Sequence, residues 1–283
     1  MGEISVGRGS DEEDEQQRED DQVFTHVCTN TTAARPFSKP LSLRPVCAHR
    51  TMPLAPLRIA HAGGGLHDRI YNNSEKALRH NQGNFTWFEL DFIWSTTGPR
   101  TLNTDAERAA VTSSTTGGYY NAKDENLADP AKLGDTENLS LEQLYALMME
   151  FPKMCVVTDV KSENVEALAL IKASMPTCYA DRIIPQIYQP EEYEPIVALG
   201  FKNIIWTLYN YAGSDDDALA ELAKMELTCV TIPQARAESG FSVRCGQAGL
   251  KVMTHTINDP AVLKTLQDEH GITEVYSDFL VVK

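Results

Sequence analysis

The chain has 283 residues, 42% of them hydrophobic, and its 40 acidic side chains against 25 basic ones give a net charge of −15. This length suits one large domain or two small ones, and the apolar fraction is sufficient for a sizeable core. No apolar run approaches the roughly 18 residues of a membrane-spanning helix, so we expect no transmembrane segment. The acidic balance argues against a nucleic-acid binder, because such proteins neutralise phosphates with Lys and Arg.

The negative charge is concentrated near the N-terminus. Residues 1–22 hold nine Asp and Glu against two Arg, which gives this segment a charge of −7. Such a block repels itself and has little to bury, so we expect it to be disordered, either as a solvated tail or as a docking tail for a basic partner. Residues 23–56 contain five prolines and show no sustained period, which is typical of a linker or loosely docked arm. We therefore predict an acidic extension over residues 1–56 and a globular domain over residues 57–283.

Cysteine usage indicates a reducing compartment. The six cysteines show no CxxC or other metal-binding spacing, and Cys155 and Cys229 lie in apolar runs where cysteine is usually a small buried hydrophobic residue. The N-terminal segment shows no basic stretch followed by an apolar one, so we expect no secretory signal. We predict six free thiols and a cytoplasmic protein.

From Leu57 onward, short β-rich runs alternate with amphipathic helical segments. The runs with strand character are Arg58–Ala62, Thr86–Phe92, Arg100–Thr104, Met154–Val160, Ile183–Tyr188, Asn203–Leu208, Thr228–Ile232, Lys251–Thr256 and Glu274–Phe279. The helical segments include one that Ser140 and Gln143 open as a capping box, and Ser162–Ala173, Glu191–Leu199, Asp215–Leu227 and Pro260–His270.

This alternation predicts a parallel α/β fold, and a TIM (β/α)8 barrel fits the length. Nine strand candidates are one too many for the barrel, so we place Arg100–Thr104 outside its wall as a short hairpin return. A doubly wound open sheet is the alternative, but no GxGxxG motif follows a strand to support a nucleotide-binding fold.

Polar residues gather where the predicted strands end, which is where a parallel barrel holds its active site. These residues are His61, Glu89, Asp91, Asp159, Lys161, His255 and, just beyond the last of these, Asn258. His61 is also followed by three glycines, which allow the backbone to approach a ligand closely.

Glu89 and Asp91 are two residues apart and therefore share one face of a strand. They lie in an otherwise apolar run, where burying a carboxylate without a cation or hydrogen bonds is costly. Together with Asp159 they offer the hard oxygen ligands that Mg²⁺ or Ca²⁺ takes. A divalent ion here would also give so acidic a protein the positive centre that phosphate binding needs. The alternative is a structural hydrogen-bonding role for these carboxylates.

Six short motifs in fixed order carry a resemblance to a known family. They are His61-Ala-Gly, Asn73-Ser74, Glu89-Leu-Asp91, Asp159-Val-Lys161, Thr256-Ile-Asn258 and Tyr276-Ser-Asp278. From about Arg58 to the C-terminus, this pattern resembles the glycerophosphodiester phosphodiesterases, whose wider group includes phosphatidylinositol phospholipase C and the spider sphingomyelinase-D toxins.

The resemblance implies a TIM barrel and a metal-dependent phosphodiesterase acting on a small phosphodiester or phospholipid-like substrate. Cleavage would proceed by hydrolysis or by attack of a neighbouring substrate hydroxyl to give a cyclic phosphate. By position, the acid/base role falls on His61, the metal ligands are Glu89, Asp91 and Asp159, and Lys161 neutralises phosphate.

Two departures from the family pattern affect the proton chemistry and the phosphate contacts. The family's second catalytic histidine is replaced by Thr104, whose hydroxyl is no proton shuttle near neutral pH. The usual arginine after the first histidine is Ala62. We expect His255, or alternatively His67, to supply a second imidazole, and Arg69 to supply a guanidinium.

Other strand-end residues are candidates for the substrate pocket. We expect Tyr188 and Asn258 to contact substrate, and the long segment 106–138 to cover the active face as a lid. Two further functional classes stay open: a pseudoenzyme that binds a phosphorylated ligand or a partner protein, and a lyase or isomerase.

Overall fold

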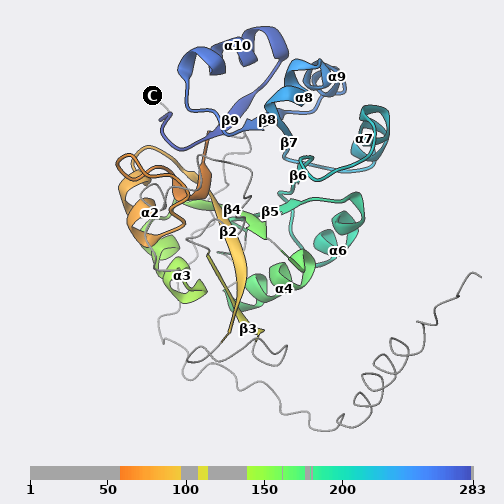
Figure 1. The fold of residues 1–283 in the computed structure, drawn as a ribbon. Helices are drawn as coiled ribbons and strands as arrows, with labels where there is room; N and C mark the ends of the chain where they lie inside the picture. The colour runs from red at the N-terminus through yellow and green to blue at the C-terminus, as the bar shows by residue number, and fades with distance from the viewer. Residues whose placement is uncertain are drawn as a thin grey trace, which may run out of the picture. The chain divides into compact units, whose positions relative to one another are not determined.

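The computed structural model describes residues 58–96, 108–113, 139–160, 162–175, 179 and 181–281. The predicted acidic extension over residues 1–56 lies outside these ranges. The described residues form the predicted α/β barrel, in which parallel strands alternate with helices that lie around them (Figure 1). No helix in this part of the chain is long and apolar enough to cross a bilayer.

Eight parallel strands close the barrel. They are β1 (Ile59–Ala60), β2 (Trp87–Thr96), β4 (Cys155–Val160), β5 (Ile183–Ile187), β6 (Ile205–Thr207), β7 (Cys229–Pro233), β8 (Val252–His255) and β9 (Glu274–Ser277). Closure occurs at β1, which pairs in parallel with both β2 and β9. The first and last strands are therefore neighbours, so residues at the two ends of the domain meet at one edge.

One further described strand, β3, lies outside the barrel wall. β3 (Arg108–Ser113) pairs antiparallel with the far part of β2, and Phe92 is opposite Ser113. The expected return strand at Arg100–Thr104 lies outside the described residues. β2 also continues four residues beyond its predicted end at Phe92, which provides the edge that β3 pairs with.

Helical segments follow the strands. They are η2 (His61–Gly63), α2 (Glu75–Asn81), α3 (Leu141–Glu150), α4 (Asn164–Ser174), η4 (Pro190–Glu192), α6 (Tyr193–Ala198), α7 (Asp215–Leu222), α8 (Gln234–Glu238), α9 (Phe241–Gln247) and α10 (Pro260–His270). The predicted capping box is present at α3: the Gln143 backbone N–H donates to Ser140 Oγ at 3.2 Å, and the Ser140 N–H donates to Gln143 Oε1 at 2.8 Å.

The core has two parts, as expected for a barrel. One lies between the strands and the helices, and Phe88, Leu90 and Phe92 of β2 belong to it. The other consists of nine buried side chains, one or two from each strand: Ile59, Trp87, Cys155, Val157, Ile184, Ile205, Cys229, Met253 and Tyr276. Trp87 alternates along β2 with Phe88, so Glu89 and Asp91 share the face of Trp87.

Three cysteines are described, and all are buried free thiols: Cys155, Cys229 and Cys245. Burial raises the pKa of Cys155 and of Cys229 to about 12, so both stay uncharged and pack as apolar groups. The free-thiol prediction is confirmed for these three, and the other three cysteines lie outside the described residues.

Candidate active site

Three acidic side chains converge at the carboxyl ends of β2 and β4. The parallel register sets Asp91 directly beside Asp159, and Glu89 beside Val157 two residues earlier. Glu89, Asp91 and Asp159 each offer an oxygen, and these oxygens lie within 4.8 Å of one another. The first two residues are only 2% exposed. The strand register therefore builds the acidic cluster that the sequence predicted.

Each carboxylate of this cluster accepts a hydrogen bond from a different kind of donor. The Ala62 backbone N–H donates to Glu89 Oε2 at 2.7 Å. Asn73 Nδ2 donates to Asp91 Oδ2 at 2.7 Å. The Tyr188 hydroxyl donates to Asp159 Oδ1. These donors fix the orientation of the carboxylates.

The donor set fits a divalent cation. Carboxylate oxygens are hard ligands, and three of them in a largely buried cluster repel one another unless a positive charge is placed between them. A hard cation such as Mg²⁺ or Ca²⁺ meets both requirements. Glu89, Asp91 and Asp159 are the residues that would hold it.

His61 lies directly after β1, at the start of a tight 3₁₀ turn in which Ala62 adopts a left-handed backbone (φ 47°). Its Nδ1 lies 2.9 Å from Oδ1 of Asp278. Because a carboxylate only accepts hydrogen bonds, Nδ1 carries a proton and donates it to Asp278. The imidazole is thereby oriented through one nitrogen, which leaves Nε2 as the atom able to exchange a proton with a ligand.

The surroundings of His61 favour its charged form. Burial by itself would lower its pKa, but the charge and hydrogen bond of Asp278, with the charges of Glu89 and Asp91, raise the pKa from 6.5 to about 9. The imidazole therefore carries a proton at neutral pH. A cation among the carboxylates would offset the part of this rise that Glu89 and Asp91 cause.

Asp278 is itself held in place by Asn258. Asn258 Nδ2 donates to Asp278 Oδ2 at 2.8 Å, and Asn258 Oδ1 accepts from the Asp278 backbone N–H and from Ser277 Oγ, each at 2.8 Å. Both ends of the Asn258 amide, a side chain that we expected to contact substrate, thus orient Asp278. The result is a chain of contacts from Asn258 through Asp278 to His61.

Buried asparagines shape the loop between β1 and α2. Asn73 has a left-handed backbone (φ 43°), its N–H donates to the Ala62 carbonyl at 2.8 Å, and its Oδ1 accepts from the Asp91 N–H at 2.9 Å. Asn81 Nδ2 donates to the carbonyls of Gly63 and Gly65. These bonds join the turn that carries His61 to the strand that carries the acidic residues.

Aromatic rings form one side of the site. Tyr188, Tyr209, His255 and Tyr276 make consecutive edge-to-face contacts, with ring centroids 5.8, 5.9 and 6.0 Å apart. His255 is therefore partly buried at the end of β8 between two tyrosines. The tyrosine expected to bind substrate, Tyr188, contacts Asp159; burial, then the charge of Asp159, raises its pKa well above 10, so its hydroxyl keeps its proton.

The structure describes two other predicted site residues, Arg69 and His67. Arg69 is exposed at a turn whose backbone pairs with Leu66. The ring of His67 lies 6.0 Å from that of His80 on α2, and both are exposed. Lys161 and Thr104 lie outside the described residues, as does segment 106–138 except for β3.

Two residues without a predicted role occupy central positions. Asp278 orients His61, and Asn73 orients Asp91. Both belong to the six motifs of the family resemblance, and this was the only signal in the sequence that could have identified them. Their contacts join residues 217 and 18 positions apart, so no local pattern predicts them.

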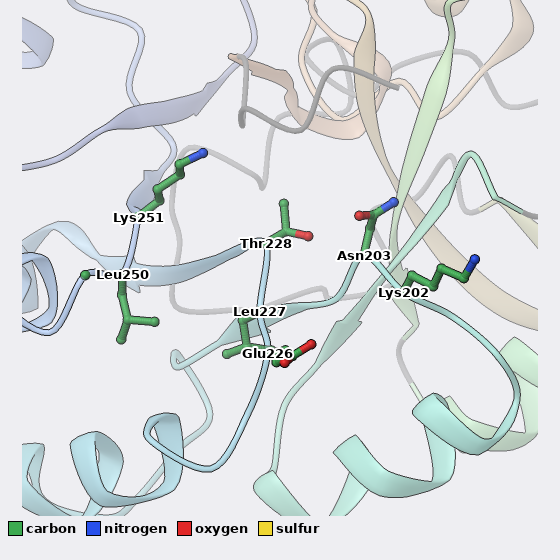
Figure 2. A pocket seen from close by; sticks show the side chains of 8 residues that line it. Lys202, Asn203, Glu226, Leu227, Thr228, Leu250 and Lys251 are labelled. Atoms are coloured by element: carbon green, nitrogen blue, oxygen red, sulfur yellow. The ribbon is translucent and has the colours of Figure 1, made fainter. Parts of the chain in front are cut away.

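A cavity of about 260 Å³ lies at the opposite ends of three strands. Its walls come from the segments leading into β6, β7 and β8 (Figure 2): Lys202, Asn203, Glu226, Leu227, Thr228, Gly249, Leu250 and Lys251. In parallel barrels the ends where strands begin serve stability rather than catalysis. The acidic cluster is therefore the candidate active site.

Comparison with solved structures supports the barrel. A glycerophosphodiester phosphodiesterase from Parabacteroides distasonis aligns with a TM-score of 0.55 and 16% identity over 78% of this chain and 91% of its own. The chain has the fold of the glycerophosphodiester phosphodiesterases. Another member of that fold from Thermotoga maritima aligns with a TM-score of 0.50 and 16% identity, over 82% of this chain and 96% of its own.

A third similar structure is a phosphodiesterase from Oleispira antarctica, solved in complex with the product sn-glycerol-3-phosphate. It aligns with a TM-score of 0.54 and 15% identity, over 80% of this chain and 94% of its own. No family model and no curated protein matches the sequence. At 15–16% identity the structural likeness establishes the fold, and the role of each residue is argued from the geometry.

Proposed function

We propose that the protein is a metal-dependent phosphodiesterase that cleaves a glycerophosphodiester or lysophospholipid-type substrate. One observation carries this proposal: an imidazole oriented by a carboxylate stands beside a buried acidic cluster. His61 is bonded to Asp278, and the next residue, Ala62, donates directly to Glu89. The proton-transfer group and the candidate metal ligands are thus separated by a single peptide unit.

When bound, the cation would supply charge stabilisation to the phosphoryl oxygens. The protein's own contribution to the reaction is proton transfer. Because Nδ1 of His61 donates to Asp278, Nε2 would deliver its proton to the leaving alcohol oxygen as the P–O bond breaks. We assign His61 as the general acid of the first step and Lys161 as an additional phosphate contact.

The nucleophile must lose a proton in the same reaction. We assign His255 as the group that accepts this proton, because His255 lies at the end of β8 on the barrel side that also carries Tyr188 and Tyr209. The nucleophile is either water, which yields a phosphomonoester, or a neighbouring substrate hydroxyl, which yields a cyclic phosphate. Phosphorus-31 NMR of the products distinguishes the two routes.

The proposal is tested by turnover of glycerophosphodiesters and lysophospholipids with Mg²⁺ present or chelated. We expect the wild-type protein to be active only with the metal, and Glu89→Gln to be inactive under both conditions. Lys264→Ala, which breaks an exposed i,i+4 ion pair with Asp268 on α10, is the control and should match wild type. Full turnover in chelator would contradict a metal-dependent mechanism.

The replacement of the second catalytic histidine by Thr104 supports one alternative, a barrel that binds a phosphorylated ligand without cleaving it. Introducing a histidine by Thr104→His separates the two functions. An inactive wild type that gains strong hydrolysis from this substitution would identify a pseudoenzyme. An active wild type that loses turnover in His255→Ala would support the phosphodiesterase.

A further inference from the structure

A buried glutamine of β5 lies beside the acidic cluster and takes no part in the proton transfer assigned above. β4 and β5 pair in parallel, and Thr158 is opposite Pro185. The next two residues, Asp159 and Gln186, are therefore neighbours on adjacent strands. Gln186 shares a strand face with Ile184, which belongs to the core inside the barrel, and it is only 3% exposed. Its side chain thus lies inside the barrel at the level of the acidic cluster.

Two hydroxyl groups from other strands orient the amide of Gln186. The Tyr276 hydroxyl of β9 donates to Gln186 Oε1 at 3.0 Å, and the Thr231 hydroxyl of β7 donates to the Tyr276 oxygen at 3.3 Å. Burial raises the pKa of Tyr276 well above 10, so this phenol keeps the proton that it donates. Because the amide oxygen of Gln186 is engaged, Nε2 is the end of the amide that remains to donate.

The backbone of Gln186 is held as firmly as its side chain. Asn164, the first residue of α4, donates Nδ2 to the Gln186 carbonyl at 2.9 Å. On the other side of β5, the parallel register with β6 pairs Gln186 with Ile205. The fold therefore sets the direction of the amide before a ligand binds, which is the arrangement expected of a preorganised binding group.

The donor end of this amide needs an acceptor. Among the hydrogen bonds of the described residues, none uses Nε2 of Gln186. A buried N–H group without an acceptor is costly, and native proteins retain few of them. An oxygen of a bound ligand meets this need. Because Gln186 neighbours Asp159, the ligand oxygens near it are those that a cation in the acidic cluster would attract, and in a phosphodiester these are the phosphoryl oxygens.

We propose that Gln186 binds the phosphoryl group of the substrate by donating from Nε2 to one of its oxygens, and that Tyr276 positions the amide for this contact. The inference rests on the proposed function, because it adds a phosphate contact to the same site. Ala62 stands where the related family has an arginine, so this chain lacks that phosphate contact. We expect Arg69 to supply one contact from the loop after β1, and the neutral amide of Gln186 supplies another from inside the barrel.

The test is Gln186→Met, which removes the amide while keeping a side chain of similar length and no charge. Binding of inorganic phosphate to the full chain at saturating Mg²⁺ is measured by calorimetry. We expect the dissociation constant to rise about tenfold or more, the usual effect of losing a hydrogen bond to a charged acceptor. Inorganic phosphate carries no alcohol, so the change reports the phosphoryl contact alone. With a glycerophosphodiester, most of the loss should appear in KM rather than in kcat.

Tyr276→Phe tests the positioning role, because it keeps the ring and removes the hydroxyl that holds Gln186 Oε1. The amide can then rotate, and the dissociation constant for phosphate should rise about threefold while Mg²⁺ affinity is unchanged. The double variant Gln186→Met with Tyr276→Phe should bind phosphate as Gln186→Met does, since Tyr276 acts through the amide; a merely structural role would give additive losses. If Gln186→Met does not fold, Tyr276→Phe alone decides the question.

Gln267→Met is the matched control, since it makes the same substitution at an exposed position of α10, where Nε2 donates to the Thr273 carbonyl at 3.4 Å. It should leave phosphate binding and KM unchanged. If wild type turns over a glycerophosphodiester but Gln186→Met and Tyr276→Phe keep its phosphate affinity and its KM within about twofold, the inference is overturned and the proposed function stands. If wild type with Mg²⁺ neither binds phosphate nor turns over the substrate, both are overturned.

Discussion

The Nδ1 atom of His61, directly after the first barrel strand, lies 2.9 Å from Oδ1 of Asp278, directly after the last. Pairing of β1 with β9 brings these residues together although 217 positions separate them in sequence. The same barrel closure that completes the fold therefore completes the proton-transfer pair. An incompletely closed barrel would lack this pair.

The first prediction concerns the charge of that pair. In Asp278→Asn, the pKa of His61 should fall well below about 9, because burial lowers it and the charge and hydrogen bond of Asp278 that oppose burial are lost. NMR titration of the histidine ring in metal-free protein measures this value. A pKa that stays near 9 in the variant would show that Asp278 is not the dominant partner.

The same shift predicts a pH dependence of stability. Since the folded-state pKa of His61 is raised, its stabilising contribution is complete below pH 6.5 and is lost as the pH rises through about 9. Its size is on the order of 3 kcal/mol as an upper bound. Metal-free wild type should therefore lose unfolding free energy over this interval, and Asp278→Asn should lose less. Parallel pH profiles for the two proteins would contradict the assignment.

The second prediction separates charge repulsion from metal binding. Asp91→Asn keeps the shape of the side chain and an oxygen for the Asn73 donor, but removes one of three clustered charges. Without metal, the variant should melt at the same temperature as wild type or higher. With Mg²⁺ at about 100 times the dissociation constant, wild type should gain about 2.7 kcal/mol and the variant nothing. Thermal melts of both proteins with and without Mg²⁺ test this prediction. An equal gain in stability in wild type and in the variant would exclude Asp91 as a ligand.

The third prediction concerns the contact between the glycine run and the chain after β9. A Cβ at Gly65 would lie 2.1 Å from Cε1 of Phe279, and the Gly65 N–H donates to the Asp278 carbonyl at 2.7 Å. Because Phe279 is exposed and its ring can move, Gly65→Ala should cost about 1 kcal/mol of unfolding free energy, at the low end of overpacking. In the presence of Phe279→Ala the added cost should largely disappear. Chemical denaturation of wild type, the two single variants and the double variant measures the coupling between the two positions. Additive changes in unfolding free energy would contradict the predicted contact.

Much of the fold was predictable because its signals are local. Pro260–His270 has both helix bounds as predicted, since Asp259 caps its first turn and Gly271 ends it in a left-handed conformation. The acidic cluster was predictable for a similar reason: two-residue spacing sets Glu89 and Asp91 on one face, and strand ends gather at one edge.

The parts that escaped prediction depend on contacts distant in sequence. β3 pairs at Arg108–Ser113 because β2 extends to Thr96 and offers an edge there, which no local pattern in the sequence reveals. The contact of Asn258 with Asp278 depends on β9 lying beside β8. Likewise, the contact of Tyr188 with Asp159 requires that β4 and β5 be neighbours.

The central claim is that His61 transfers the proton while the three carboxylates hold the metal. It is tested most directly by the turnover number of His61→Gln on a glycerophosphodiester at saturating Mg²⁺, with Mg²⁺ affinity measured on the same sample. We predict a turnover number lowered by a factor of about 10²–10⁴, the usual contribution of a positioned acid, with metal affinity within a few-fold of wild type. A variant that binds Mg²⁺ and turns over at the wild-type rate would contradict the account.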